Sequence, residues 1–159
     1  MNIEYVCKKD RLYSGGNEIL SYKLETPVFF SADEITSFYT AVSDECEKYC
    51  KGELFDRLCV CGDRKRYSYV LICRVTYCGD GVASVILFAY LRSGKEILSK
   101  YAGAHTWELA SGLLLPPEYV WRREKENKKA KREDVEGVFI DGGRVRNIRE
   151  VYIWDLLTR

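Results

Sequence analysis

Several segments of this chain alternate apolar and polar residues with a period of two, which is typical of β-strands. Residues 67–78 show a long alternation of this kind, and residues 82–91 follow after the turn-forming Gly79-Asp80-Gly81. The second segment is apolar on nearly both faces, which favours a central strand of an antiparallel sheet. Ser93-Gly94 predicts another turn, after which residues 96–101 return as a third strand.

Two further strands are predicted near the N-terminus. Residues 3–7 and 18–29 are rich in aromatic and β-branched side chains, and Ser14-Gly15-Gly16-Asn17 lies between them. Glycine and asparagine adopt the backbone angles that tight turns require. We therefore expect these two segments to be strands joined by a hairpin-like loop.

The period changes to that of an amphipathic helix after residue 30. Ser31 and Glu34 have the spacing of a capping box, which predicts a helix start. The apolar positions that follow have the i, i+3, i+4, i+7 spacing of one helix face. They are Ile35, Phe38, Tyr39, Val42, Cys46, Tyr49 and Cys50. Lys51-Gly52 is typical of a helix end or break, after which residues 53–58 could add a turn. We expect a helix before it whose apolar face covers a sheet.

The C-terminal part predicts a second helix and two more strands. The helix begins near Glu118, and its sequence starts amphipathic and ends charged. Residues 138–140 and 145–154 flank the turn-forming Asp141-Gly142-Gly143. Together the elements predict one α+β domain over residues 1–159. It is a mainly antiparallel meander, covered on one face by one long helix, with a second charged helix.

The composition is that of a globular protein. Of 159 residues 47% are hydrophobic, and 25 Lys and Arg residues balance 24 Asp and Glu residues. This balance argues against coating nucleic acid. The longest apolar run, residues 82–91, is far shorter than the roughly 20 residues of a membrane-spanning helix. The N-terminus lacks the features of a signal peptide, so we expect a cytoplasmic protein with reduced cysteines.

The run from Arg122 to Arg132 is a local exception to the charge balance. It carries seven basic and two acidic residues, a surplus that could meet phosphates. No aromatic residue is interleaved in the run for base stacking. We interpret it as a solvated helix face, and nucleic-acid contact is the weaker alternative.

Several short motifs resemble a known bacterial module. They are Ser14-Gly-Gly-Asn-Glu-Ile-Leu-Ser-Tyr22, Ala32-Asp-Glu-Ile-Thr-Ser-Phe-Tyr39, Ala83-Ser84-Val85, Gly103-Ala104-His105 and Leu109-Ala-Ser-Gly-Leu-Leu-Leu115. Over residues 3–120 the chain is similar to the uncharacterised domain of RsiV-like lysozyme-binding anti-sigma factors, which also occurs beside PdaC-like peptidoglycan deacetylases. The resemblance implies an α+β domain whose role is binding, chiefly at the cell envelope. It implies no deacetylase activity.

Aromatic residues and the single histidine are the candidate binding residues, because amphipathic rings give a large contact area at little entropic cost. The candidates are His105, Trp107, Tyr90 and Tyr101. Tyr67, Tyr69 and Tyr77 also share one predicted strand face. The alternative is that such a face is buried under the helix. His105 would then be structural, with a ring nitrogen bonded to a backbone carbonyl.

The cysteines offer a different chemistry. Four of them have the spacing C-x3-C-x8-C-x-C, namely Cys46, Cys50, Cys59 and Cys61. Four thiolates could close a tetrahedral zinc site with bonds of about 2.3 Å. A thiolate with His105 as its base could instead serve a hydrolase. Against zinc, Cys46 and Cys50 belong to the apolar helix face, where a free thiol packs as a small hydrophobe.

The leading hypothesis from the sequence is a non-catalytic binding module that needs no cofactor and whose ligand is an unknown protein or glycan. The alternative is a small cysteine and histidine hydrolase or a zinc-binding protein. A third class is a structural protein that dimerises through an exposed edge strand. The sequence leaves the oligomeric state open.

Overall fold

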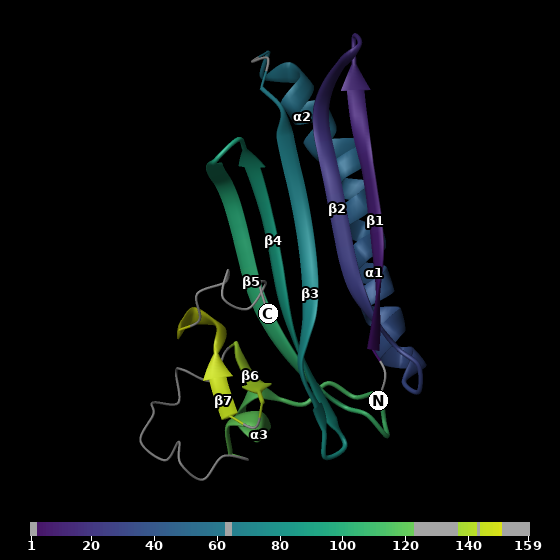
Figure 1. The fold of residues 1–159 in the computed structure, drawn as a ribbon, viewed down its shortest axis with the longest axis vertical. Coiled ribbons are helices and arrows are strands. Elements are labelled where there is room, and N and C mark those ends of the chain that lie inside the picture. Colours follow the sequence, from purple (N-terminus) through teal and green to yellow (C-terminus); the bar gives the residue numbers. More distant parts are fainter. Residues whose placement is uncertain (1–2, 63–64, 123–136, 143, 151–159) are drawn as a thin grey trace.

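The computed structural model describes residues 3–62, 65–122, 137–142 and 144–150. It has an α+β fold with a mixed five-stranded sheet in the order β1-β2-β3-β4-β5. The strands are β1 (Ile3–Ser14), β2 (Asn17–Phe29), β3 (Tyr67–Gly79), β4 (Val82–Ser93) and β5 (Glu96–Glu108). One long helical segment lies along one face of the sheet, behind β1 and β2 in Figure 1. The predicted fold class is therefore confirmed.

The sheet is mainly antiparallel, as expected, but it contains one parallel pair. β2 and β3 run in the same direction, with Leu20 opposite Tyr67, while the other neighbours are antiparallel. The helical segment between them has 28 residues, which is about 42 Å of helix. The 13 residues of β2 span about 43 Å. The helix thus returns the chain to the start of β2, so β3 begins beside that point and runs parallel to it.

The helical segment continues where the sequence predicted a break. It consists of α1 (Asp33–Tyr49), a π-helical turn η1 (Cys50–Leu54) and α2 (Phe55–Val60). The break expected at Lys51-Gly52 is wrong, because the π turn includes this dipeptide without ending the helix. The helix starts close to the predicted position, at Asp33, with Ala32 as its N-cap residue. Just before it, the Thr36 hydroxyl accepts a hydrogen bond from the N–H of Phe29 at 2.8 Å.

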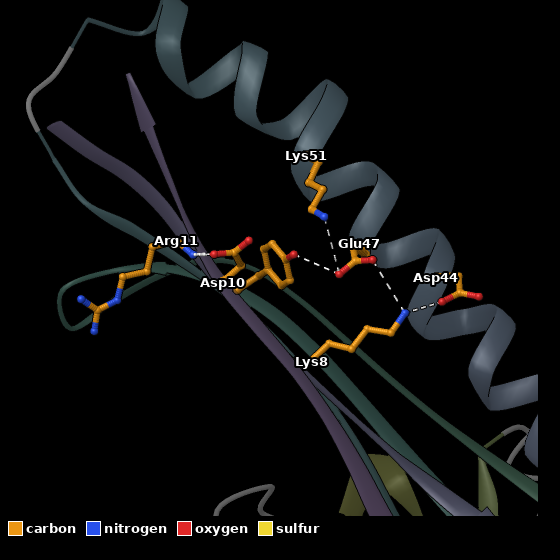
Figure 2. Close-up of polar contacts among 7 residues, drawn as sticks. Lys8, Asp10, Arg11, Asp44, Glu47 and Lys51 are labelled. Carbon is orange, nitrogen blue, oxygen red and sulfur yellow. Dashed lines mark hydrogen bonds and ion pairs between the residues drawn. The ribbon is translucent and has the colours of Figure 1, made fainter. Parts of the chain in front are cut away.

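A row of polar contacts fixes the outer flank of the helix over β1 and β2 (Figure 2). Lys8 contacts the Asp44 carboxylate and lies 3.7 Å from Glu47, and its hydrogen bond with Asp44 raises the pKa of Lys8. Glu47 accepts a hydrogen bond from the Tyr22 hydroxyl at 3.0 Å and pairs with Lys51 at 3.9 Å. Because exposed ion pairs contribute little to stability, this row mainly orients the helix.

The main core lies between the helical segment and the sheet. Its buried members come from the helix and from β2 to β5. They are Leu20, Tyr22, Leu24, Phe29, Ala32, Ile35, Tyr39, Cys50, Leu54, Leu58, Tyr67, Leu71, Cys73, Ala83, Val85, Leu87 and Trp107. Each large apolar side chain among them contributes about 1.5–3 kcal/mol on burial. The predicted apolar helix face is therefore the face that covers the sheet.

A β-bulge in β3 changes which face its last residues occupy. The register shifts between Val75 and Tyr77. After this shift Cys78 packs against the helix-side core, whereas Tyr77 packs on the opposite face. The prediction that Tyr77 shares a face with Tyr67 and Tyr69 is therefore wrong, because the extra residue of a bulge reverses the alternation.

A small second layer covers the lower part of the other sheet face (Figure 1). It consists of α3 (Pro117–Arg122), β6 (Val138–Asp141) and β7 (Arg144–Asn147), followed by a single 3-10 turn, η4 (Ile148–Glu150). Phe139 packs on Ile86 and Phe88. The N–H of Ile140 donates to the Ser84 hydroxyl at 3.0 Å, a buried hydrogen bond that ties β6 to β4.

The C-terminal strands agree only in part with the prediction: the strand expected at residues 145–154 stops at Asn147, and residues 148–150 form a 3-10 turn instead. β6 matches the strand expected at residues 138–140, and β7 ends at Asn147. Residues 151–154 of the second predicted strand and residues 123–132 of the basic run lie outside the described residues. α3 begins at Pro117, next to the start expected near Glu118. In the described ranges, no helix has the length and apolar character needed to span a bilayer.

Candidate ligand-binding site

Two of the predicted site residues, His105 and Trp107, belong to an aromatic cluster beneath α1. β5 runs through both of them, although the sequence predicted that the strand ends at Tyr101. The indole N–H of Trp107 donates to the Tyr39 hydroxyl at 2.9 Å, and that hydroxyl lies 3.3 Å from Nδ1 of His105. Tyr39 is fully buried. The sequence analysis expected a ring nitrogen of His105 to bond to a backbone carbonyl. In the structure the imidazole bonds to the Tyr39 side chain instead.

Burial sets the protonation of this cluster. Desolvation raises the pKa of Tyr39 and lowers the pKa of His105, so both groups are neutral at pH 7. Because the Tyr39 oxygen accepts from Trp107, its own proton is available to Nδ1 of His105, which leaves the imidazole proton on Nε2. The Phe38 ring packs edge-on, 5.4 Å from the His105 ring and 5.0 Å from the Trp107 ring. This setting suits a structural imidazole.

The other two predicted residues, Tyr101 and Tyr90, project from opposite faces of the sheet. Tyr101 pairs with Ala89 on the helix side and is 63% exposed. Its ring lies against Gly103, where a Cβ would be 3.1 Å from the Tyr101 hydroxyl. Tyr90 lies between Ala89 and Leu91, which face the helix-side core, so its side chain projects from the other face. Both tyrosines nevertheless border one groove, so the structure brings the four predicted residues together as two pairs, His105 with Trp107 and Tyr90 with Tyr101.

A groove lies beside Tyr101, between the C-terminal half of the helical segment and β3 to β5. Its volume is about 270 Å³, and its lining includes Tyr49, Leu54, Tyr69, Leu91, Lys100 and Tyr101. The rings of Tyr49 and Tyr69 meet edge to face at 6.2 Å. Burial raises the pKa of Tyr69, so its phenol stays neutral. The π turn carries Leu54 into the groove wall, and such turns recur at functional sites.

The outer side of β5 is a free sheet edge over part of its length. In the described residues the segment around Leu114 pairs with β5 at Trp107, but no strand pairs with the outer side of β5 before that point. Residues 96–102 are all exposed, and they include Ile97 at 45% and Leu98 at 46%. An exposed edge with apolar side chains is a template for another strand.

The four cysteines of the predicted zinc site are not brought together. Cys46 and Cys50 face the core, Cys59 lines a separate hollow of about 650 Å³, and Cys61 is exposed. Within the described ranges, no group of three or more His, Cys, Asp or Glu side chains is placed to hold a metal ion. Burial raises the pKa of Cys50 and of Cys73 to about 12. These two thiols are therefore protonated at neutral pH and pack as apolar groups.

Sequence reasoning assigned no site role to Tyr49, Leu54 or Lys100, and it considered Tyr69 only as part of an aromatic strand face. Tyr49 and Tyr69 were predicted on the helix face and the strand face that pack together, so their proximity could have been inferred. Leu54 was given no site role because a helix end or break was expected at Lys51-Gly52, with only a further turn after it. Lys100 belongs to no sequence motif. It becomes a candidate binding residue only because β5 lies at the edge of the sheet.

The fold is similar to that of two solved bacterial structures. A DUF3298 family protein from Pseudomonas aeruginosa PAO1 aligns with a TM-score of 0.52 at 14% identity, covering 74% of this chain. The alignment spans 56% of the length of that Pseudomonas chain. A DUF3298 family member from Bacteroides fragilis NCTC 9343 aligns with a TM-score of 0.50 at 11% identity, over 83% of this chain and 71% of that one. No protein-family model and no curated protein sequence matches the chain.

These structural neighbours carry the name of a domain of unknown function. That agrees with the resemblance to an uncharacterised domain, and at such low identity the likeness concerns the fold alone. The association with RsiV-like anti-sigma factors or PdaC-like deacetylases stays a prediction.

Proposed function

We propose that this chain is a non-catalytic binding module that captures an extended segment of a protein partner along the outer edge of β5. The observation that carries the proposal is the exposed stretch of β5 at residues 96–102, whose outer side pairs with no strand among the described residues, beside a tyrosine-lined groove. The main-chain groups of such an edge bind a peptide strand, and pockets for alternate side chains provide specificity. Of the two ligand classes that the sequence left open, this edge favours a protein.

The groove indicates which side chains the captured segment carries. Successive side chains of an added strand point to opposite faces. On the helix side they reach a groove of about 270 Å³ whose walls include Leu54, Tyr69 and Leu91, which suits an apolar side chain. Lys95 and Lys100 have no acidic partner among the described residues, so they favour an acidic residue in the ligand. We therefore expect a segment that combines apolar and acidic residues.

A second copy of this chain fits the edge less well. A seam between two β5 edges would collect Lys95 and Lys100 from both chains, with Glu96 as the opposing charge. The seam would carry an excess of positive charge, and like charges across a strand pair are destabilising. A charged edge of this kind also protects against self-pairing.

Peptide display against the purified protein tests the proposal. The selected peptides should carry apolar residues at alternate positions and shift the backbone amide NMR signals of residues 96–102. Tyr101→Ala should weaken their binding at least about tenfold, because it removes an aromatic anchor. The matched control is Tyr119→Ala, which removes a tyrosine of similar exposure, 52%, from α3 and should leave affinity unchanged. A peptide N-methylated on its bonded amides should lose binding.

Three results would contradict this proposal. The first is a set of peptides whose NMR shifts fall outside β5 and the groove. The second is an equal loss of affinity in Tyr101→Ala and Tyr119→Ala. The third is a mass that doubles with concentration while the β5 signals shift, because the edge would then pair with a second copy. Stoichiometric zinc in elemental analysis, or hydrolysis that His105→Ala removes, would favour the alternative chemistry.

A further inference from the structure

The sheet face opposite the helix carries a second surface, which is separate from the β5 edge. The β6–β7 layer covers the lower part of this face (Figure 1). Farther along the same strands, β1 to β4 border a hollow of about 570 Å³. The side chains that define it are Lys9, Arg11, Ser21, Lys23, Ser68 and Arg92.

Strand register arranges four of these residues in one row across the sheet. Arg11 lies opposite Ser21, Ser21 opposite Ser68, and Ser68 opposite Arg92. Four adjacent strands span about 14 Å. The two serine hydroxyls lie 3.1 Å apart at the centre of the row. The row therefore has a guanidinium at each end and hydroxyl groups between them.

A second row on the same face places two like charges opposite each other. Lys9 and Lys23 are direct cross-strand partners. Like charges in this position destabilise a sheet. Lys23 lies 4.0 Å from Glu25, but Glu25 is held by Arg74 at 2.6 Å, and Lys9 has no acidic partner among the described residues. An anionic group bound between the two ammonium groups would remove their repulsion.

The acids near the hollow neutralise these cations only in part. Glu18 is shared between Arg11 at 3.4 Å and Arg66 at 3.8 Å. The carboxylate of Asp10 accepts a hydrogen bond from the N–H of Arg11, and the two side chains project to opposite sides of β1 (Figure 2). Arg92 has no acidic partner in the described part of the chain. The electrostatic potential over the hollow is therefore positive.

We propose that this hollow binds an acidic glycan, a chain of sugar rings that carries carboxylate or sulfate groups. Guanidinium groups bind such anions in a bidentate manner, and serine hydroxyls can both donate to and accept from sugar hydroxyls. Tyr13, which is 56% exposed, stands at the hairpin end of the hollow, where its ring can cover a sugar. The residues between Arg11 and Arg92 are serines, so this row offers no aromatic platform on which nucleic-acid bases could stack.

Isothermal titration with two probes tests this site, a galacturonic acid oligosaccharide and a heparin-derived oligosaccharide. At least one should bind, and its affinity should fall as salt is added, because exposed charges are screened. The fully methyl-esterified galacturonic acid oligosaccharide keeps the rings without the charge and should not bind. Lys9→Ala/Lys23→Ala should lose at least about tenfold in affinity, because it removes two anion contacts. Lys48→Ala/Lys51→Ala makes the same charge change on the helix and should bind like the original protein.

A melting temperature separates loss of the site from loss of the fold. Because Lys9→Ala/Lys23→Ala removes a repulsion, its melting temperature should be no lower than that of the original protein. The proposal is overturned if neither oligosaccharide binds, if the two double variants bind equally, or if oligothymidylate of matched charge binds more tightly than both. Tyr101→Ala should keep glycan binding, and Lys9→Ala/Lys23→Ala should keep peptide binding. The experiments therefore test the two sites independently of each other.

Discussion

The helix-facing side of β5 holds two aromatic groups with contrasting surroundings. At the lower end His105 and Trp107 lie under α1 and form hydrogen bonds through Tyr39. At the upper end Tyr101 is 63% exposed and borders a groove. The strand and the face are the same, so residue type does not separate the two groups. The lower group differs in that the segment around Leu114 pairs with the outer side of the strand and α1 lies across its face.

Coverage explains why one group is core and the other is surface. At Trp107 the outer edge of β5 is paired through Leu114, and the N–H of Leu115 donates to the Thr106 carbonyl at 2.8 Å. At Tyr101 no such partner exists among the described residues. Polar groups of a covered ring must bond inside the protein, whereas those of an exposed ring can bond to water or to a ligand. The lower group therefore stabilises the fold, and the upper group is available for binding.

Truncation of the two large rings should separate stability from binding most clearly. Trp107→Ala removes a core ring and should lower the free energy of unfolding by about 3–5 kcal/mol. Tyr101→Ala should change it by less than about 0.5 kcal/mol. Urea unfolding followed by circular dichroism measures both values. A similar decrease in the free energy of unfolding in the two variants would show that Tyr101 belongs to the core and would contradict this contrast between the two groups.

Removal of one hydroxyl tests the hydrogen bonds of the lower group. Tyr39→Phe keeps the ring but leaves the indole N–H of Trp107 without its acceptor, which should cost about 1–3 kcal/mol in unfolding free energy. Tyr69→Phe is the matched change in the groove, where the hydroxyl lies 3.7 Å from the Cys46 sulfur, a weak partner. Its cost should be clearly smaller. A reversed order in urea unfolding would contradict the assignment of Tyr39 as the centre of the cluster.

Low pH should reduce the contribution of the lower aromatic group to stability, because His105 becomes protonated. Burial lowers the folded-state pKa of His105 below its usual 6.5, so the unfolded chain binds more protons between the two values. The contribution of His105 to stability is therefore complete above pH 6.5 and is lost as pH falls from there to the folded-state pKa. His105→Asn keeps an acceptor but does not titrate. The difference in unfolding free energy between the two proteins should shrink as the pH is lowered, and a constant difference would contradict this account.

The smallest change in stability is expected at Gly103. Gly103→Ala should alter the free energy of unfolding by less than about 1 kcal/mol, because its Cβ meets only the mobile end of Tyr101. The same Cβ would displace the Tyr101 ring and should weaken peptide binding. Titration of a selected peptide, with urea unfolding alongside, measures both effects. Unchanged affinity would show that the position of the Tyr101 ring does not matter for the groove.

The sequence allowed much of the fold to be predicted, and much less of the candidate site. Alternation, turn residues and the helical spacing located the five long strands of the sheet and the helix face that covers it. The hairpin turn at residues 15–16 was predictable because both positions are glycines, and the structure confirms that both have positive φ. The predicted strand stopped at Tyr101, so His105 and Trp107 were not placed on β5, and their burial was not predictable because it depends on Tyr39 and on the segment around Leu114. The groove depends on a π turn that no local pattern indicated.

The sequence by itself determined the local elements of this protein, because backbone preferences and the spacing of apolar residues act over a few neighbouring positions. Only the tertiary structure decided the parallel pairing of β2 with β3, since that depends on an unbroken helix as long as the strand it returns along. It also decided the face of Tyr77, which one extra residue in β3 reversed. Exposure of Tyr101 and burial of Trp107 follow from what lies across the strand, and that is settled by distant parts of the chain.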